Sequence, residues 1–197
     1  MGGKSFGGRR IDRGEVESLV ESLKTSLALS DIPTQIAGSY RREKADSGDV
    51  DLVFIPHEKD VERVKITLKS TFGRLKTKDE PQMAGLYDGV QFDFHLTRLT
   101  CLGSMMLHAT GSWQFNKFMR TRAMSAGYKL NQYGLFDRGT NEPVLQSSDE
   151  APFFRVLKME FVPPVDRSSG RQFFAESWST GQQVKYELTE DAWKVVE

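Results

Sequence analysis

The sequence lacks the features that several protein classes require. Its 197 residues include one cysteine, Cys101, so an internal disulfide is excluded and a reducing compartment suits the chain. No apolar run is long enough to cross a bilayer, and no signal peptide or internal repeat is present. These absences exclude a disulfide scaffold, a helical membrane protein and a repeat protein.

An excess of charge of either sign is also missing, because 27 Lys and Arg balance 27 Asp and Glu. Nucleic-acid-binding proteins often carry surplus positive charge, so this balance counts mildly against one. The basic residues are nevertheless clustered. The run from Arg63 to Lys78 contains no acid, and residues 117–129 hold a second basic stretch. Each stretch is either an ordinary solvated face or a nucleic-acid contact.

Hydrophobic periodicity indicates an α+β fold. It predicts helices over 12–29, 58–72, 112–127 and 153–161, and strands over 35–37, 49–55 and 89–97. Ser112 is the expected N-cap of the third helix, whose core stripe is Phe115, Phe118, Met119 and Ala123. Residues 73–88 are rich in turn formers, and a hairpin is expected over 128–136, returning through 137–139. Ser147 with Glu150 resembles a capping box for the last helix. Residues 168–197 are interpreted as an appendage in which Val184, Tyr186 and Leu188 alternate as in a strand.

Acidic residues on two predicted strands form the most informative pattern. Asp49 and Asp51 lie on the same side of one strand, because side chains alternate with a period of two residues. Asp93 lies on the polar side of a second strand. If the strands pair in a compatible register, the three carboxylates converge and repel by roughly 4 kcal/mol per pair at about 4 Å and an effective dielectric of about 20. Such a cluster suits Mg²⁺, whereas Asp-x-Asp alone is also common on surface strands.

The residues that precede the acids favour the metal-site interpretation. Gly38-Ser39-Tyr40-Arg41-Arg42 lies just upstream of Asp49. Gly38 allows the backbone to approach a phosphate, Ser39 offers a hydroxyl and Arg42 a bidentate fork. Ser47-Gly48 adds a second small turn beside the aspartates. A phosphate cradle followed by a metal site is far more specific than either part alone.

These residues resemble the signature of the nucleotidyltransferase superfamily, and in detail that of family X DNA polymerases, the polymerase beta-like enzymes. The segment Thr110–Arg120 (TGSWQFNKFMR) is similar to the family's thumb-start motif Thr-Gly-Ser-x-x-Phe-Asn-x-x-Met-Arg. Residues 128–136 and the closing helix through Arg167 continue the likeness. The resemblance runs from about Arg10 to Arg167.

The resemblance implies a nucleotidyltransferase palm, a mixed or antiparallel sheet flanked by helices, and a small α/β thumb-like subdomain. The expected division is a flexible tail over 1–9, a catalytic palm over 10–107, a nucleotide-selection subdomain over 108–167, and an extension of unknown role over 168–197. An N-terminal lyase domain is not expected, and such a minimal architecture is similar to that of viral members.

The resemblance also assigns site residues. Asp49 and Asp51 would bind both of two Mg²⁺ ions, with Mn²⁺ as a substitute, and Asp93 only the ion nearest the primer 3′-hydroxyl. The implied nucleotide-binding residues are Arg10, Ser39, Arg42, Ser47, Gly48, His108, Gly111, Ser112, Trp113 and Asn116. Lys117 and Arg120 would contact template DNA. Helical spacing independently places Trp113, Asn116, Lys117 and Arg120 on one face, which is otherwise an ordinary solvated face.

One departure concerns the sugar. The family usually has an aromatic pair before Thr-Gly-Ser, and here His108-Ala109 stands there. Loss of the large ring predicts weaker exclusion of ribonucleotides. His108 is otherwise a phosphate contact or a packing histidine, and Trp113 would stack on the incoming base.

The sequence therefore predicts a DNA-directed DNA polymerase that fills short gaps in repair or replication. Its expected partners are a dNTP and a primer-template or gapped duplex, with no membrane; we expect an intracellular monomer in the cytoplasm or nucleoid of a host cell. One alternative is a template-independent or small-substrate nucleotidyltransferase with the same acids. Another is a catalytically silent DNA-binding module, which the presence of all three carboxylates disfavours.

Overall fold

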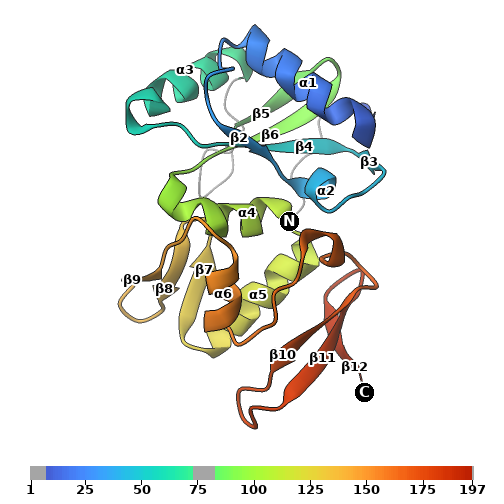
Figure 1. Ribbon diagram of the computed structural model, residues 1–197, viewed down its shortest axis with the longest axis vertical. Helices are drawn as coiled ribbons and strands as arrows, with labels where there is room; N and C mark the ends of the chain where they lie inside the picture. Colours follow the sequence, from blue (N-terminus) through green and yellow to red (C-terminus); the bar gives the residue numbers. More distant parts are fainter. Residues whose placement is uncertain (1–7, 73–82, 197) are drawn as a thin grey trace. The chain divides into compact units, whose positions relative to one another are not determined.

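The computed structural model describes residues 8–72 and 83–196, and the α+β class is observed there (Figure 1). The chain divides after Arg98 into two compact units, 1–98 and 99–197, and each has a hydrophobic core of its own. Residues 1–7 of the expected tail and residues 73–78 of the basic run lie outside the described residues. None of the described helices combines the length and apolarity that crossing a membrane requires.

The first unit is built on a four-stranded sheet in the order β2-β4-β6-β5. Its strands are β2 (Thr34–Ile36), β4 (Asp49–Phe54), β5 (Met83–Tyr87) and β6 (Val90–Leu96). The central strands β4 and β6 run parallel, while β2 and β5 pair antiparallel at the two edges. The two strands that carry the acids are therefore neighbours.

Helices α1 (Arg13–Ser26) and α3 (Val61–Phe72), the latter preceded by the 3₁₀ turn η1 (Glu58–Asp60), cover one face of this sheet (Figure 1). Apolar residues at helical spacing on α1, such as Val16, Val20 and Leu23, pack with every second residue of β4 and β6. Alternation sends the other residues of both strands, the three acids included, to the opposite face.

Two short elements complete the first unit. The strand pair β1 (Ile11–Asp12) and β3 (Asp46–Ser47) is antiparallel, and α2 (Gly38–Arg41) is a single helical turn between β2 and β3. Of the expected tail, Arg9 is anchored, because its backbone N–H donates to the Gly89 carbonyl and its guanidinium pairs with Asp88.

The sequence interpretation missed β5 because Met83–Tyr87 lacks an apolar alternation. Gly85 explains how the strand packs: a Cβ there would lie 2.3 Å from a ring carbon of Phe72 on α3. The glycine lets the helix approach the strand closely, which a pattern of hydrophobic residues does not reveal.

In the second unit, helices α4 (Leu102–Thr110) and α5 (Trp113–Ser125) are followed by a three-stranded sheet. Its strands are β7 (Tyr128–Asn131), β8 (Gly134–Asp137) and β9 (Pro143–Leu145). The 3₁₀ turn η2 (Leu99–Cys101) precedes α4, and α6 (Ala151–Val156) and η3 (Pro164–Asp166) follow β9. As expected, Ser112 caps α5, because its Oγ accepts from the Phe115 N–H. The predicted core stripe of α5 is buried.

Three local expectations in this unit were wrong. The hairpin turns at residues 132–133, and residues 137–139 lead instead from β8 towards β9. The last helix ends at Val156, well before residue 161. Ser147 is not the cap of this helix, because α6 starts after Glu150, which is itself the N-cap. Both carboxylate oxygens of Glu150 accept from the buried guanidinium of Arg167.

The C-terminal segment is a third sheet, made of β10 (Gln172–Glu176), β11 (Gln183–Leu188) and β12 (Trp193–Val196). The strand predicted around Val184, Tyr186 and Leu188 is confirmed as β11. Phe173, Ala175 and Leu188 are buried in the same core as α5, so this segment packs as part of the second unit.

Candidate active site

The three acids lie on one face of the first unit's sheet, on its two central strands. In the parallel pair β4 and β6, Asp51 stands directly opposite Asp93, and Asp49 stands opposite Gln91. Cα-paired residues of neighbouring strands project to the same face. The observed register of β4 and β6 is therefore compatible with the convergence of the three acids on one face.

Two further side chains on this face hold acid oxygens. Nε2 of His95 lies 3.0 Å from Oδ1 of Asp51, and the Gln91 amide donates to Oδ1 of Asp93 at 3.0 Å. Both His95 and Gln91 are buried, and both lie two residues from Asp93 on β6. Sequence reasoning missed them as site residues, although the alternation of β6 already placed them on the acidic face.

The electrostatics of the cluster are those of crowded carboxylates. Burial, followed by the charges of Asp51 and Asp93, raises the pKa of Asp49 to about 6. Burial and the charge of Asp51 also raise the pKa of Asp93, against the opposing effects of the Gln91 hydrogen bond and of His95. The Arg42 guanidinium lowers the pKa of Asp49 and so partly offsets the repulsion.

The turn α2 lies against these acids, because its first residue is glycine. Gly38 has φ +59°, a conformation that L side chains rarely adopt, and a Cβ there would lie 2.2 Å from Oδ2 of Asp51. The glycine therefore lets the backbone of the predicted cradle approach the carboxylate itself. Arg13 supports the same turn, since its guanidinium stacks on the Tyr40 ring and donates to the Tyr40 carbonyl.

The remaining cradle residues surround α2. Ser39 Oγ lies 2.7 Å from Ser47 Oγ, which ties the turn to β3. Arg10 forms a bidentate pair with Asp46, from Nε and Nη2, at 2.9 and 2.7 Å. A Cβ on Gly48 would lie 3.2 Å from Arg10 Nη1, so Arg10 also borders the Ser47-Gly48 turn. The structure thus brings together every site residue that was predicted for the first unit.

The donor set of this face suits a hard divalent cation. The three carboxylates repel one another and offer oxygen ligands, and a bound cation would relieve that repulsion. Within residues 8–72 and 83–196, no three His, Cys, Asp or Glu side chains already stand close enough together to enclose an ion. Each of the hydrogen bonds from His95 and Gln91 holds one oxygen of Asp51 or Asp93.

Four predicted residues of the second unit lie along α5. Trp113 and Lys117 are exposed and contact each other, with Lys117 Nζ 4.9 Å from the ring centroid of Trp113. The Asn116 amide donates to the His108 carbonyl at 2.8 Å. Arg120 Nη2 lies 2.9 Å from His108 Nδ1. His108 on α4 is therefore linked to two residues of this face.

Gly111 and Ser112 form the junction between α4 and α5. Gly111 has φ +69°, which suits glycine. The Ser112 backbone N–H donates to the Arg167 carbonyl at 3.2 Å, while its Oγ caps α5. The junction is thus anchored to the end of the closing segment, and it fixes where the α5 face begins.

Comparison with known proteins finds a family model that matches part of each unit. The DNA polymerase beta palm model matches residues 10–88, and the DNA polymerase beta thumb model matches residues 105–168. Among curated proteins, the chain is similar to the repair DNA polymerase X of African swine fever virus, with 31% identity over 66% of this chain and 78% of that protein. It is also 32% identical to Saccharomyces cerevisiae DNA polymerase IV, over 48% of this chain and 16% of that enzyme.

A solved structure shares the fold. Polymerase beta of Leishmania infantum, in a ternary P/T complex, matches with a TM-score of 0.61 and 26% identity, over 81% of this chain and 77% of that one.

Proposed function

This chain belongs to the beta-like family X of DNA-directed DNA polymerases, and from that premise we propose that Asp49, Asp51 and Asp93 carry its nucleotidyl transfer. The observation that carries the proposal is the register of β4 and β6, which sets Asp51 opposite Asp93 with Asp49 on the same face. The reaction joins the primer 3′-hydroxyl to the α-phosphate of a dNTP and releases pyrophosphate.

Family X polymerases depend on metal ions, and Asp49, Asp51 and Asp93 are the residues that would hold them here. Two Mg²⁺ ions, or Mn²⁺ in their place, would supply an activated 3′-hydroxyl and charge neutralisation on the leaving pyrophosphate. Asp49 and Asp51 would serve both ions and Asp93 the one beside the primer. His95 and Gln91 orient Asp51 and Asp93 by the hydrogen bonds described above.

The cradle would bind the triphosphate. The Arg42 guanidinium acts on Asp49 and offers donors there. The Ser39 hydroxyl lies in the same turn as Gly38, whose backbone approaches Asp51. Arg10, Ser47 and Gly48 would meet the outer phosphates. Because Asp46 occupies the Nε and Nη2 edge of Arg10, the Nη1 edge towards Gly48 is the one that we assign to phosphate.

The second unit would select the nucleotide. Trp113 would stack on the incoming base and Asn116 would contact its minor-groove edge, with Gly111 and Ser112 beside the sugar. Lys117 and Arg120 would contact the template. His108 links two residues of this face, because its carbonyl accepts from the Asn116 amide and its ring Nδ1 lies beside the Arg120 guanidinium. This cluster favours a templated polymerase over a small-substrate transferase, which needs no template-facing helix.

We propose a gapped duplex or primer-template as the DNA substrate and repair as the setting. The matching Leishmania infantum structure is a ternary P/T complex by title, and the viral relative is a repair polymerase by name. The testing experiment is primer extension across a one-nucleotide gap with Mg²⁺, for the parent and for Asp93→Ala. Extension with the complementary dNTP that is lost in Asp93→Ala supports the proposal, whereas untemplated tailing favours the alternative transferase.

A further inference from the structure

The sheet β10-β11-β12 lies beyond the thumb-model match, which ends at residue 168, and the nucleotidyl-transfer site does not use it. Its inner face nevertheless meets α5. The Phe118 ring contacts one ring from each strand, with centroid distances of 4.8 Å to Phe173, 4.9 Å to Tyr186 and 5.2 Å to Trp193. Phe118 is buried, so these rings enclose it.

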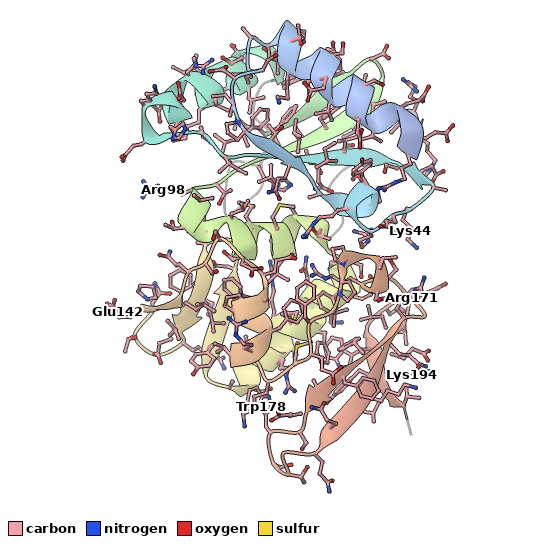
Figure 2. All side chains as sticks on the ribbon, viewed as in Figure 1. Lys44, Arg98, Glu142, Arg171, Trp178 and Lys194 are labelled. Carbon is pink, nitrogen blue, oxygen red and sulfur yellow. The ribbon has the colours of Figure 1, made fainter. Side chains whose placement is uncertain are left out.

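Two hydrogen-bonding side chains attach α5 to the same sheet on either side of Phe118. The Gln114 amide donates to the Glu190 carbonyl in the turn between β11 and β12. The Arg122 guanidinium donates to the Glu176 carbonyl at the end of β10 and to the Leu157 and Lys158 carbonyls. It also stacks on Trp178, 4.5 Å from the ring centroid. Figure 2 labels Trp178 and draws the side chains between α5 and this sheet.

The geometry of the helix relates this attachment to the selecting face. Gln114, Phe118 and Arg122 fall at i, i+4 and i+8, so they form one stripe along α5. At about 100° per residue, the stripe of Trp113, Asn116, Lys117 and Arg120 is centred about 150° away around the helix. The sheet therefore contacts α5 on nearly the opposite side from the residues proposed to meet the base pair.

The sheet is itself held against the body of the second unit. Met159 forms an isolated bridge with Ala175, and the Glu176 N–H donates to the Lys158 carbonyl at 2.9 Å. Rotation or translation of α5 would have to break the ring contacts of Phe118 or the hydrogen bonds at its two ends.

We propose that β10-β11-β12 is a positioning element for nucleotide selection: it fixes the axial rotation of α5 and so aims Asn116, Lys117 and Arg120. This inference rests on the proposed polymerase function. Phe118 and Trp193 are its principal positioning residues, since Trp193 packs against Phe118 from the edge strand β12. Neither residue contacts the nucleotide or the DNA in this proposal.

The test compares Trp193→Ala with Phe174→Ala in single-nucleotide insertion into a one-nucleotide gap. Phe174 is the matched control, because it lies on β10 next to Phe173 but projects from the other face of the sheet and is 39% exposed. The quantity measured is the ratio of kcat/KM for the correct dNTP to that for an incorrect one. A loss of folded protein lowers both values equally and cancels in this ratio.

We expect Trp193→Ala to lower the selectivity ratio by about tenfold, since small misplacements of positioned groups have large kinetic effects, and Phe174→Ala to leave it within about twofold. An unchanged ratio in Trp193→Ala, or an equal loss in Phe174→Ala, overturns the inference. If Trp193→Ala does not fold, Trp193→Phe takes its place. A smaller loss in the same direction supports the inference and an unchanged ratio overturns it.

Hydrogen exchange separates this inference from the proposed function. In Trp193→Ala, the amides of α5 should exchange faster than in the parent, while those of the β7-β8 hairpin keep their rates. If the parent selects the correct dNTP, and Trp193→Ala changes neither the selectivity ratio nor the exchange rates of α5, the positioning role alone is refuted. A parent that inserts no nucleotide refutes the polymerase proposal and, with it, the role in selection.

Discussion

Neutralising Asp49 should stabilise the protein when divalent ions are absent. Burial and the charges of Asp51 and Asp93 raise the pKa of Asp49 from 3.8 to about 6, so ionisation of this carboxyl costs free energy in the folded state. Asp49→Asn keeps the shape of the side chain and removes the charge. We therefore expect this substitution to increase the free energy of unfolding, contrary to the usual effect of a mutation.

The magnitude follows from the pKa. A pKa of about 6 in place of 3.8 corresponds to about 3 kcal/mol at full weight. Although neighbouring groups desolvate the Asp49 carboxyl, the residue as a whole keeps exposed surface, and solvent screening reduces the expected gain to about 1 kcal/mol.

The pH dependence has a defined sign. Between pH 3.8 and about 6 the folded state binds more protons at Asp49 than the unfolded state does, so stability falls as pH rises through this window. The gain in the free energy of unfolding from Asp49→Asn should be fully present above about pH 6 and absent below pH 3.8.

The assay is urea unfolding with a chelator, at about pH 7.5 and about pH 4. A second series with Mg²⁺ should reverse the order, because the parent gains stability by binding ions and Asp49→Asn loses a ligand. Asp191→Asn, an exposed acid in the turn between β11 and β12, is the control and should change little in either series. Destabilisation of metal-free Asp49→Asn at the higher pH would refute the reasoning.

The remaining predictions concern neighbouring residues. Gly38→Ala should cost about 1–3 kcal/mol of stability, because its Cβ would meet Asp51 at 2.2 Å; urea unfolding measures this, and a neutral effect contradicts the close approach. His95→Ala should cost about 1–3 kcal/mol, since it removes the buried partner of Asp51; an unchanged unfolding midpoint would show that the pair is unimportant. With His108-Ala109 in place of the family's aromatic pair, ATP and dATP should be incorporated with equal efficiency, and a strong preference for dATP would disprove this. Lys117→Ala should weaken binding to gapped DNA and reduce the slope of log affinity against log salt by about 1; an unchanged slope would remove Lys117 from the DNA contact.

Much of the candidate site could be predicted because its chemistry follows local rules. Alternation along two strands placed Asp49, Asp51 and Asp93 on polar faces, and the observed register then set Asp51 opposite Asp93. Ser112 as an N-cap and the core stripe of α5 were equally accessible, since both depend on residues within a few positions.

Features that depend on distant partners could not be predicted. His95 binds an oxygen of Asp51 only because β6 lies beside β4 in this register. Glu150 looked like part of a capping box, yet its partner Arg167 lies beyond the helix. A single sequence gives the residue type of each partner but not the tertiary pairing.

The C-terminal sheet shows the same limit on a larger scale. The strand around Tyr186 was predictable from its alternation, whereas its packing against Phe118 joins residues that are far apart in the sequence. The sequence assigned no role to Trp193, because its role depends on the tertiary contact with Phe118.

The central claim is that the acids of β4 and β6 hold the metal ions of nucleotidyl transfer. Anomalous diffraction from crystals soaked with Mn²⁺ and a non-hydrolysable dNTP analogue tests it most directly. The account predicts anomalous peaks bound by Asp49 and Asp51, with Asp93 on one of them and the triphosphate on the cradle at Ser39 and Arg42. A bound nucleotide with no peak among these three carboxylates would contradict it.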